Sequence, residues 1–149
     1  MSSKMFLLVW LIVAFYVFLG VPRIFKWMMV NNIGLKKYVV SYRDFQASER
    51  EINTICGLRL PLAAGGIYVS IGLARIALSN EYFFIAPSLK LLSFVIPTWM
   101  IPFSEIGEIK SQNNSQFKAL LLDKAGKTIV SVMIFNRDAF LIMCQSRLT

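Results

Sequence analysis

The residues from Met5 to Val21, MFLLVWLIVAFYVFLGV, form a run of seventeen without a charged side chain. At a rise of ~1.5 Å per residue, a helix of this run is about 26 Å long, slightly shorter than the ~30 Å hydrocarbon core of a bilayer. The residues that follow can lengthen it, because the side chains of Arg23 and Lys26 are long enough to carry their charges to the headgroups. A helix that is apolar on every side requires lipid or the interior of a large protein. A chain of 149 residues offers little such interior, so we expect a membrane anchor within residues 1–30.

A cleaved signal peptide is the alternative for this end of the chain. Its apolar region is typically about 7–15 residues long and is followed by small residues at the cleavage site. The run here is longer, and Phe18, Leu19 and Gly20 do not form a small-x-small site. The sequence therefore favours an anchor that is retained.

Basic residues are distributed unequally about the apolar run. Lys4 stands before it, whereas Arg23, Lys26, Lys36 and Lys37 stand after it. Cytoplasmic flanks of membrane helices carry an excess of Lys and Arg. We therefore expect a single-pass protein whose C-terminal domain is cytoplasmic, with these four later side chains at the membrane surface.

The composition limits the chemistry that the chain can perform. Lys and Arg outnumber Asp and Glu by 16 to 8, but the basic residues are spread singly, so we expect no nucleic-acid partner. Histidine is absent, which removes the commonest general base and the commonest zinc ligand. Cys56 and Cys144 have no metal-type spacing, and we expect buried free thiols.

Residues 31–57 are expected to be a juxtamembrane helix and linker. Leu35, Tyr38, Val39 and Tyr42 have helical spacing, so Leu35–Arg43 predicts a short basic amphipathic helix. Its apolar face has two possible positions: on the membrane surface, or against the domain that follows.

Residues 58–149 are expected to form one domain of six or seven antiparallel strands in a partly open barrel, closed by a C-terminal helix. Turn residues at Ser79–Glu81 and at Asp123–Gly126 predict two hairpins, and Asn136 is expected to cap the helix. Leu60–Leu78 is the ambiguous segment, because it is apolar enough for a second membrane span. Pro61, the glycines and the β-branched residues of this segment favour strands instead.

This order resembles the pleckstrin-homology-like fold, including its GRAM and bacterial relatives. The resemblance is carried by GIYV from Gly66, by IALSNEYFFI from Ile76 and by IPFSEI from Ile101. The chain is similar in particular to small bacterial proteins with one N-terminal span, such a domain and no assigned role. The resemblance implies a bacterial inner (plasma) membrane. It does not imply phosphoinositide binding, because Leu60–Arg75 lacks the cluster of Lys and Arg that lipid-binding members carry.

The sequence shows no catalytic constellation, and we expect no enzyme activity, no cofactor and no metal. Glu105, Glu108 and Asp123 are expected to be solvated or paired with Lys110 or Lys124. No glycine-rich phosphate loop and no serine nucleophile motif is present.

The function that remains is binding. We expect a membrane-anchored module that binds a protein partner at the inner leaflet. The alternatives are an accessory subunit of a larger membrane complex, a toxin-neutralising immunity protein, and a multi-span protein that uses residues 60–78 as a second span. The expected surface for a partner or for lipid consists of seven apolar residues, Leu91, Leu92, Phe94, Val95, Ile96, Trp99 and Met100.

Overall fold

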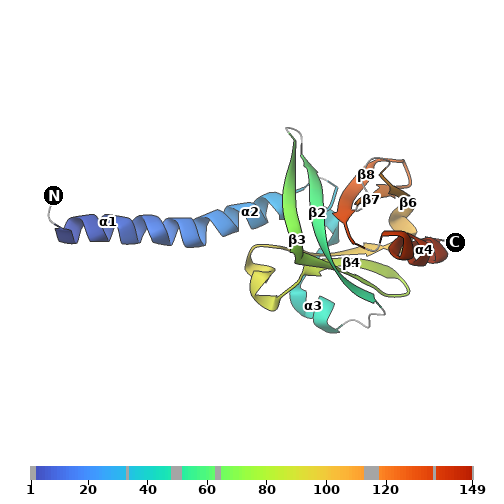
Figure 1. Ribbon diagram of the computed structural model, residues 1–149, viewed down its shortest axis with the longest axis horizontal. Coiled ribbons are helices and arrows are strands. Elements are labelled where there is room, and N and C mark those ends of the chain that lie inside the picture. Colours follow the sequence, from blue (N-terminus) through green and yellow to red (C-terminus); the bar gives the residue numbers. More distant parts are fainter. Residues whose placement is uncertain are drawn as a thin grey trace.

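A computed structural model shows a long N-terminal helix joined to a β domain, with the two chain termini at opposite ends of the molecule (Figure 1). The structure describes residues 3–32, 34–47, 52–62, 65–112, 118–135 and 137–148. One helix in this described part, Ser3–Val30, has the length and composition to cross a membrane.

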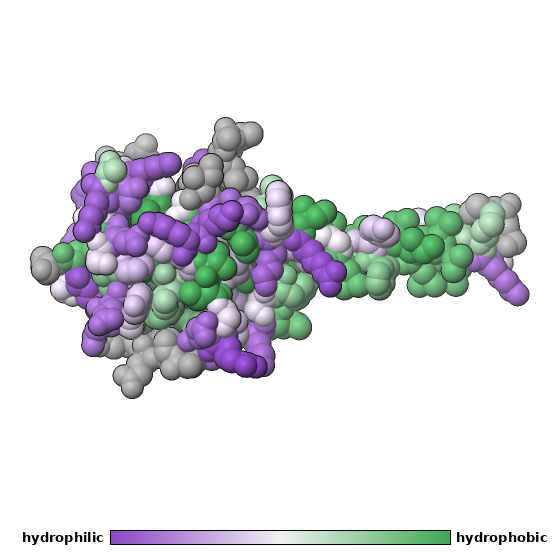
Figure 2. Space-filling view, turned by 180° about the vertical axis from the view of Figure 1, so that it is seen from behind, coloured by the Kyte–Doolittle hydropathy of each residue, from purple (hydrophilic) through white to green (hydrophobic). Residues whose placement is uncertain are grey.

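The N-terminal helix has three segments in one continuous rod. They are α1 (Ser3–Phe15), a π-helical turn η1 (Tyr16–Gly20) and α2 (Val21–Val30). Pro22 has no N–H to bond the carbonyl four residues earlier, and its ring crowds that carbonyl, so a wider turn at this point is expected. No side chain of α1 is buried, and the helix is apolar along its length (Figure 2).

The last turn of the helix enters the domain. Met29 is fully buried in the main core, together with Leu35 and Tyr38 of the segment that follows. The helix is therefore fixed to the domain by packing and not by a free linker.

The domain is an eight-stranded antiparallel sheet in the order β1-β5-β4-β3-β2-β8-β7-β6. The strands are β1 (Val39–Val40), β2 (Ile52–Leu62), β3 (Gly65–Leu78), β4 (Tyr82–Pro87), β5 (Thr98–Pro102), β6 (Ile106–Ser111), β7 (Lys118–Asp123) and β8 (Thr128–Met133). The short helices are η2 (Lys36–Tyr38), α3 (Tyr42–Ala47), η3 (Lys90–Phe94) and η4 (Phe103–Glu105), and α4 (Arg137–Leu148) ends the chain. The expected order of apolar helix, antiparallel partly open sheet and C-terminal helix is confirmed, and the sheet has eight strands where six or seven were expected.

Strand β2 curls the sheet by pairing on both sides. It pairs with β3 along its length and with β8 from Gly57 to Arg59, and its register against β3 shifts at Gly57. A Cβ atom at Gly57 would lie 2.9 Å from the carbonyl oxygen of Val69, so only glycine permits this close approach without a shift of the backbone.

Both predicted hairpins are present. Strands β3 and β4 pair around Ser79–Glu81, and β7 and β8 pair around Asp123–Gly126. Gly126 has a φ of 79°, which this turn requires and which glycine adopts without strain. The predicted cap at Asn136 lies outside the described residues.

Helix α4 packs on the sheet at the end of the molecule farthest from α1 (Figure 1). Its residues Phe140 and Cys144, four apart, are buried, and the Phe140 ring meets Phe83 edge-on at a centroid distance of 5.9 Å. Met143, the residue before Cys144, is exposed.

The prediction of a helix at Leu35–Arg43 was wrong. Val39 and Val40 pair with β5 as a short strand, while Leu35 and Tyr38 are buried in the domain. Of the two positions foreseen for this apolar face, packing on the domain is the observed one.

The favoured prediction of strands at residues 60–78 is confirmed, and the alternative of a second span is excluded. These residues belong to the β2–β3 hairpin, in which the backbone N–H and C=O groups pair between strands.

The outer face of the sheet carries a second, smaller apolar cluster under α3. Phe45 is fully buried there, with its ring 5.7 Å from that of Phe84. The Arg75 guanidinium lies 5.0 Å from the centre of the Phe45 ring and donates a hydrogen bond of 2.8 Å to the Tyr42 hydroxyl. Two aromatic side chains, the buried Phe45 and the half-buried Tyr42, therefore hold α3 to the sheet.

Replacing Phe45 by alanine is expected to lower the free energy of unfolding by about 3–5 kcal/mol, because it removes a fully buried ring. Guanidinium unfolding of the detergent-solubilised protein, followed by near-ultraviolet circular dichroism, measures this change. Gln46→Ala on the exposed side of α3 is the control, with an expected change within about 0.5 kcal/mol. Equal effects of the two substitutions would contradict the proposed packing of α3.

Candidate interaction site

The loop between β4 and β5 is apolar on two sides. Within η3, residues three apart lie on the same side of the turn. Leu92 and Val95 face inward and pack against the main core, whereas Leu91 and Phe94 face outward. The exposed fractions are 76% for Leu91, 48% for Phe94 and 64% for the adjacent Leu89. The inner pair holds the loop in place, and the outer three residues form an apolar surface, which we call the η3 loop surface.

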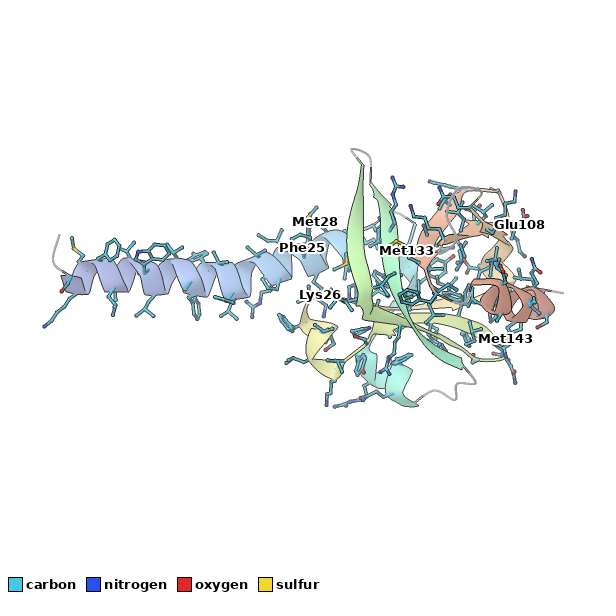
Figure 3. The ribbon with its side chains drawn as sticks, in the orientation of Figure 1. Phe25, Lys26, Met28, Glu108, Met133 and Met143 are labelled. Carbon is cyan, nitrogen blue, oxygen red and sulfur yellow. The ribbon has the colours of Figure 1, made fainter. Side chains whose placement is uncertain are left out.

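This surface lies beside the end of the N-terminal helix. The Lys26 ammonium group donates a hydrogen bond of 2.6 Å to the carbonyl oxygen of Ser93, which joins α2 to η3. Figure 3 shows Lys26 between α2 and the loop. The loop is therefore fixed at the end of the domain from which the helix emerges.

The seven apolar residues expected at a partner or lipid surface are divided by the structure. Leu91 and Phe94 are exposed, and Leu92, Val95 and Met100 are half-buried. Ile96 and Trp99 lie in the core, so neither can belong to a surface. The predicted set did not name Leu89, because only the structure distinguishes the two sides of η3.

The four basic residues expected at the membrane surface have different surroundings. Arg23 and Lys36 are exposed, and Lys26 is half-buried against the loop. Lys37 turns toward the domain and forms an ion pair with Glu105 of η4, which the sequence did not foresee.

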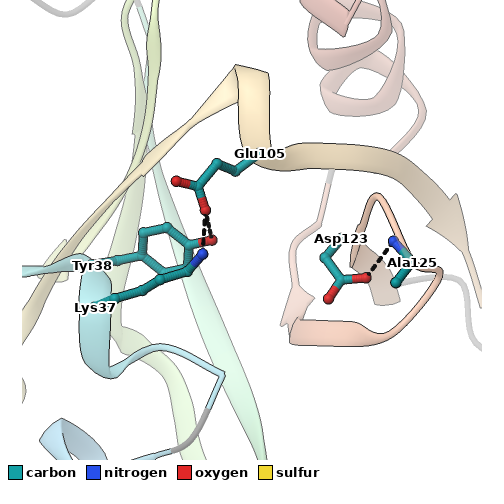
Figure 4. A network of polar contacts seen from close by, with 5 residues as sticks. All are labelled: Lys37, Tyr38, Glu105, Asp123 and Ala125. Carbon is teal, nitrogen blue, oxygen red and sulfur yellow. Dashed lines mark hydrogen bonds and ion pairs between the residues drawn. The ribbon is translucent and has the colours of Figure 1, made fainter.

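Lys37, Tyr38 and Glu105 form one polar network (Figure 4). The Tyr38 hydroxyl donates a hydrogen bond of 2.5 Å to the same Glu105 oxygen that pairs with Lys37. These two donors lower the pKa of Glu105, with Lys37 as the larger cause. The bond from the ammonium group to Glu105 raises the pKa of Lys37 to about 12. Burial, followed by the bond to Glu105, raises the pKa of Tyr38.

A cavity of about 430 Å³ opens beside this network. Its walls are Gly34, Lys37 and Tyr38 of the linker, Ser104 and Glu105 of η4, and the turn between β7 and β8 with the start of β8. The turn is held by Asp123, whose carboxylate accepts hydrogen bonds of 2.9 Å from the backbone N–H groups of Ala125 and Lys127. The cavity wall therefore combines three lysines with two carboxylates. The hydrogen bonds of Asp123 fix the backbone of the turn that carries two of these lysines.

Among the described residues, no group of three or more Cys, Asp or Glu side chains is placed to hold a metal ion. Cys56 and Cys144 are buried free thiols, as expected. Burial raises the pKa of both, that of Cys144 to about 12, so neither resembles a reactive thiolate. Glu108 pairs with Lys110 at 3.2 Å, as the sequence indicated.

No protein-family model matches the chain, and no curated protein sequence matches it. The solved structures that are similar in fold include the following two. The C-terminal domain of an unknown protein from Leishmania infantum is 12% identical, covers 72% of this chain and 92% of its own, and has a TM-score of 0.49. The N-terminal PH domain of the human ARAP2 protein is 11% identical, covers 68% of this chain and 84% of its own, and has a TM-score of 0.47. These two similarities concern the fold of the backbone and carry no information about activity.

The lowered pKa of Glu105 can be tested by carbon NMR titration of its carboxylate. Lys37→Met and Tyr38→Phe are both expected to raise this pKa, the first by more, because the ammonium group is the larger cause. Lys110→Met is the control and is expected to leave Glu105 unchanged. The contribution of the network to stability is present above the ordinary pKa of glutamate, about 4.3, and is lost as the pH falls through the lower folded value. An identical Glu105 titration in all variants would contradict the network.

Proposed function

We propose that the chain is a single-pass protein of a bacterial inner membrane, with the domain on the cytoplasmic side, and that it is a non-catalytic module that binds a protein partner. The uncovered N-terminal helix carries this proposal. Its 28 residues correspond to a rod about 42 Å long, enough to cross a bilayer and its headgroup layer on one side. The protein itself leaves the apolar side chains of α1 exposed, and lipid is the medium in which such a helix is stable.

The charges favour the cytoplasmic position of the domain. Arg23, Lys26 and Lys36 all lie at the domain end of the helix, against Lys4 at the other end. The excess of Lys and Arg marks the cytoplasmic flank. Anionic lipids of the inner leaflet also attract such a cluster.

Orientation and retention of the helix can be tested by cysteine labelling in intact cells. A membrane-impermeant maleimide is expected to label Lys4→Cys but not Ser111→Cys, and inside-out vesicles should show the reverse. The parent protein is the control and should stay unlabelled, because both of its own thiols are buried. Labelling of Ser111→Cys in intact cells would reverse the orientation. A mature mass that lacks the apolar run would instead identify the helix as a signal peptide.

The partner-binding part of the proposal is supported by the cavity beside Lys37 and Glu105. The cavity is concave, and its walls come from the domain and the linker and not from the N-terminal helix. Side chains of both charges line it. Lys124 and Lys127 are exposed on its rim, whereas Glu105 is already engaged by two donors. The charge that the cavity offers to a partner is therefore positive, which suits an acidic segment of another protein.

Photocrosslinking in cells tests the partner. A benzoylphenylalanine at Lys124 is expected to give a discrete adduct with a second protein, because this position lies on the cavity rim. The same residue at Gln46, exposed on α3 and outside the cavity wall, is the control and should give none. Loss of the adduct when Lys127→Glu is added would assign it to the basic rim. No adduct at Lys124, or equal adducts at both positions, would contradict binding in the cavity.

A further inference from the structure

The position of the η3 loop surface along the helix axis can be derived from the sequence and one contact. From Met5 to Phe25 the helix rises about 30 Å, which equals the thickness of the hydrocarbon core. Lys26 is the next residue, so its backbone lies at the boundary between acyl chains and headgroups. The Ser93 carbonyl, 2.6 Å from the Lys26 ammonium group, is therefore at the depth of this boundary.

The residues beside Ser93 place apolar atoms at the same depth. Phe94 follows Ser93 directly, and Leu91 lies two residues before it. Both side chains point away from the core, and Leu89 precedes them in the loop. Three large exposed apolar side chains in water would be costly, by roughly 25 cal/mol for each Å² of apolar surface. At the acyl boundary, the same three side chains are favourable.

The charges around this surface suit a bilayer with anionic lipids. Lys90 is exposed within the loop, and Arg23 is exposed one helical turn before Lys26. Trp27, the residue after Lys26, is exposed, and tryptophan side chains concentrate at membrane interfaces. The described residues of the loop, Leu89–Phe94, include no acidic side chain. Apolar side chains with a basic fringe are the composition of segments that lie in the interface.

We infer that the η3 loop surface is a second membrane contact, in which Leu89, Leu91 and Phe94 enter the acyl boundary of the leaflet that the helix has just left. This inference rests on the proposed membrane anchoring and deepens it. With Met29 buried in the core and Lys26 bonded to the loop, the helix and the loop are two fixed points on one rigid body. The domain consequently has a single orientation on the bilayer instead of a free rotation about a tether.

Spin labels on the full-length protein test this contact. The protein is reconstituted in vesicles of equal parts phosphatidylcholine and phosphatidylglycerol, with a nitroxide at Leu91→Cys or Phe94→Cys. The ratio of collision rates with oxygen and with a water-soluble nickel chelate is then measured, since it rises with depth in lipid. The matched control is Ile142→Cys on α4, because Ile142 is 68% exposed and lies at the far end of the domain. Val13→Cys in α1 reports whether the helix itself is in lipid.

The expected result is an oxygen-to-nickel ratio at positions 91 and 94 severalfold higher than at position 142, with position 13 higher still. A ratio at 91 and 94 equal to that at 142, with position 13 in lipid, would overturn the loop contact and leave the anchoring intact. A low ratio at position 13 would overturn both. All labelled side chains except Val13 are on the domain surface, so the circular dichroism of the parent should be retained. A variant that fails this check is replaced by a label at Leu89→Cys, because Leu89 is also exposed, at 64%.

Discussion

The structure depends on one constraint: the protein does not cover its own N-terminal helix. The helix α1 is apolar around its circumference and none of its side chains is buried, and a helix of this kind is stable in an apolar medium. The last two turns of the helix connect it to the domain. Met29 enters the core, Lys26 bonds the η3 loop, and Arg23 begins the basic fringe.

The sheet turns this single point of attachment into a rigid connection. Strand β2 pairs with both β3 and β8, and the close approach at Gly57 permits the bend between the two. The interior that results accepts Leu35 and Tyr38 as well as Met29, so three residues from the helix and its exit belong to the same core as Trp99. A module built in this way transmits the orientation of its helix to its domain. The surfaces proposed for binding, the cavity at Glu105 among them, then have fixed positions relative to the bilayer, provided that the helix spans it.

Much of the fold could be predicted from local patterns, and the errors have a common cause. The two hairpins follow from turn residues between β-branched runs, and α4 follows from apolar residues at helical spacing. Leu35–Arg43 has the same helical spacing but is not one helix. Val39 and Val40 find a strand partner in β5, far away in the sequence, and this pairing outweighs a local preference. The candidate site shows the same limit. The sequence indicated that residues 91–100 are apolar. It could not indicate that Trp99 is buried and Leu91 exposed, because an apolar composition is compatible with either side chain in the core.

The sequence by itself determined that the chain has an uncharged apolar run with an excess of basic residues after it, that it contains no histidine, and that strands precede a final helix. These properties depend on residue type and on near neighbours along the chain. The tertiary structure alone decided that Lys37 pairs with Glu105 and that Lys26 reaches Ser93, since each pair is separated by more than sixty residues. It also decided which side of η3 is exposed. Contacts of that range depend on the tertiary fold, and for this reason the surface beside the N-terminal helix could be located only from the structure.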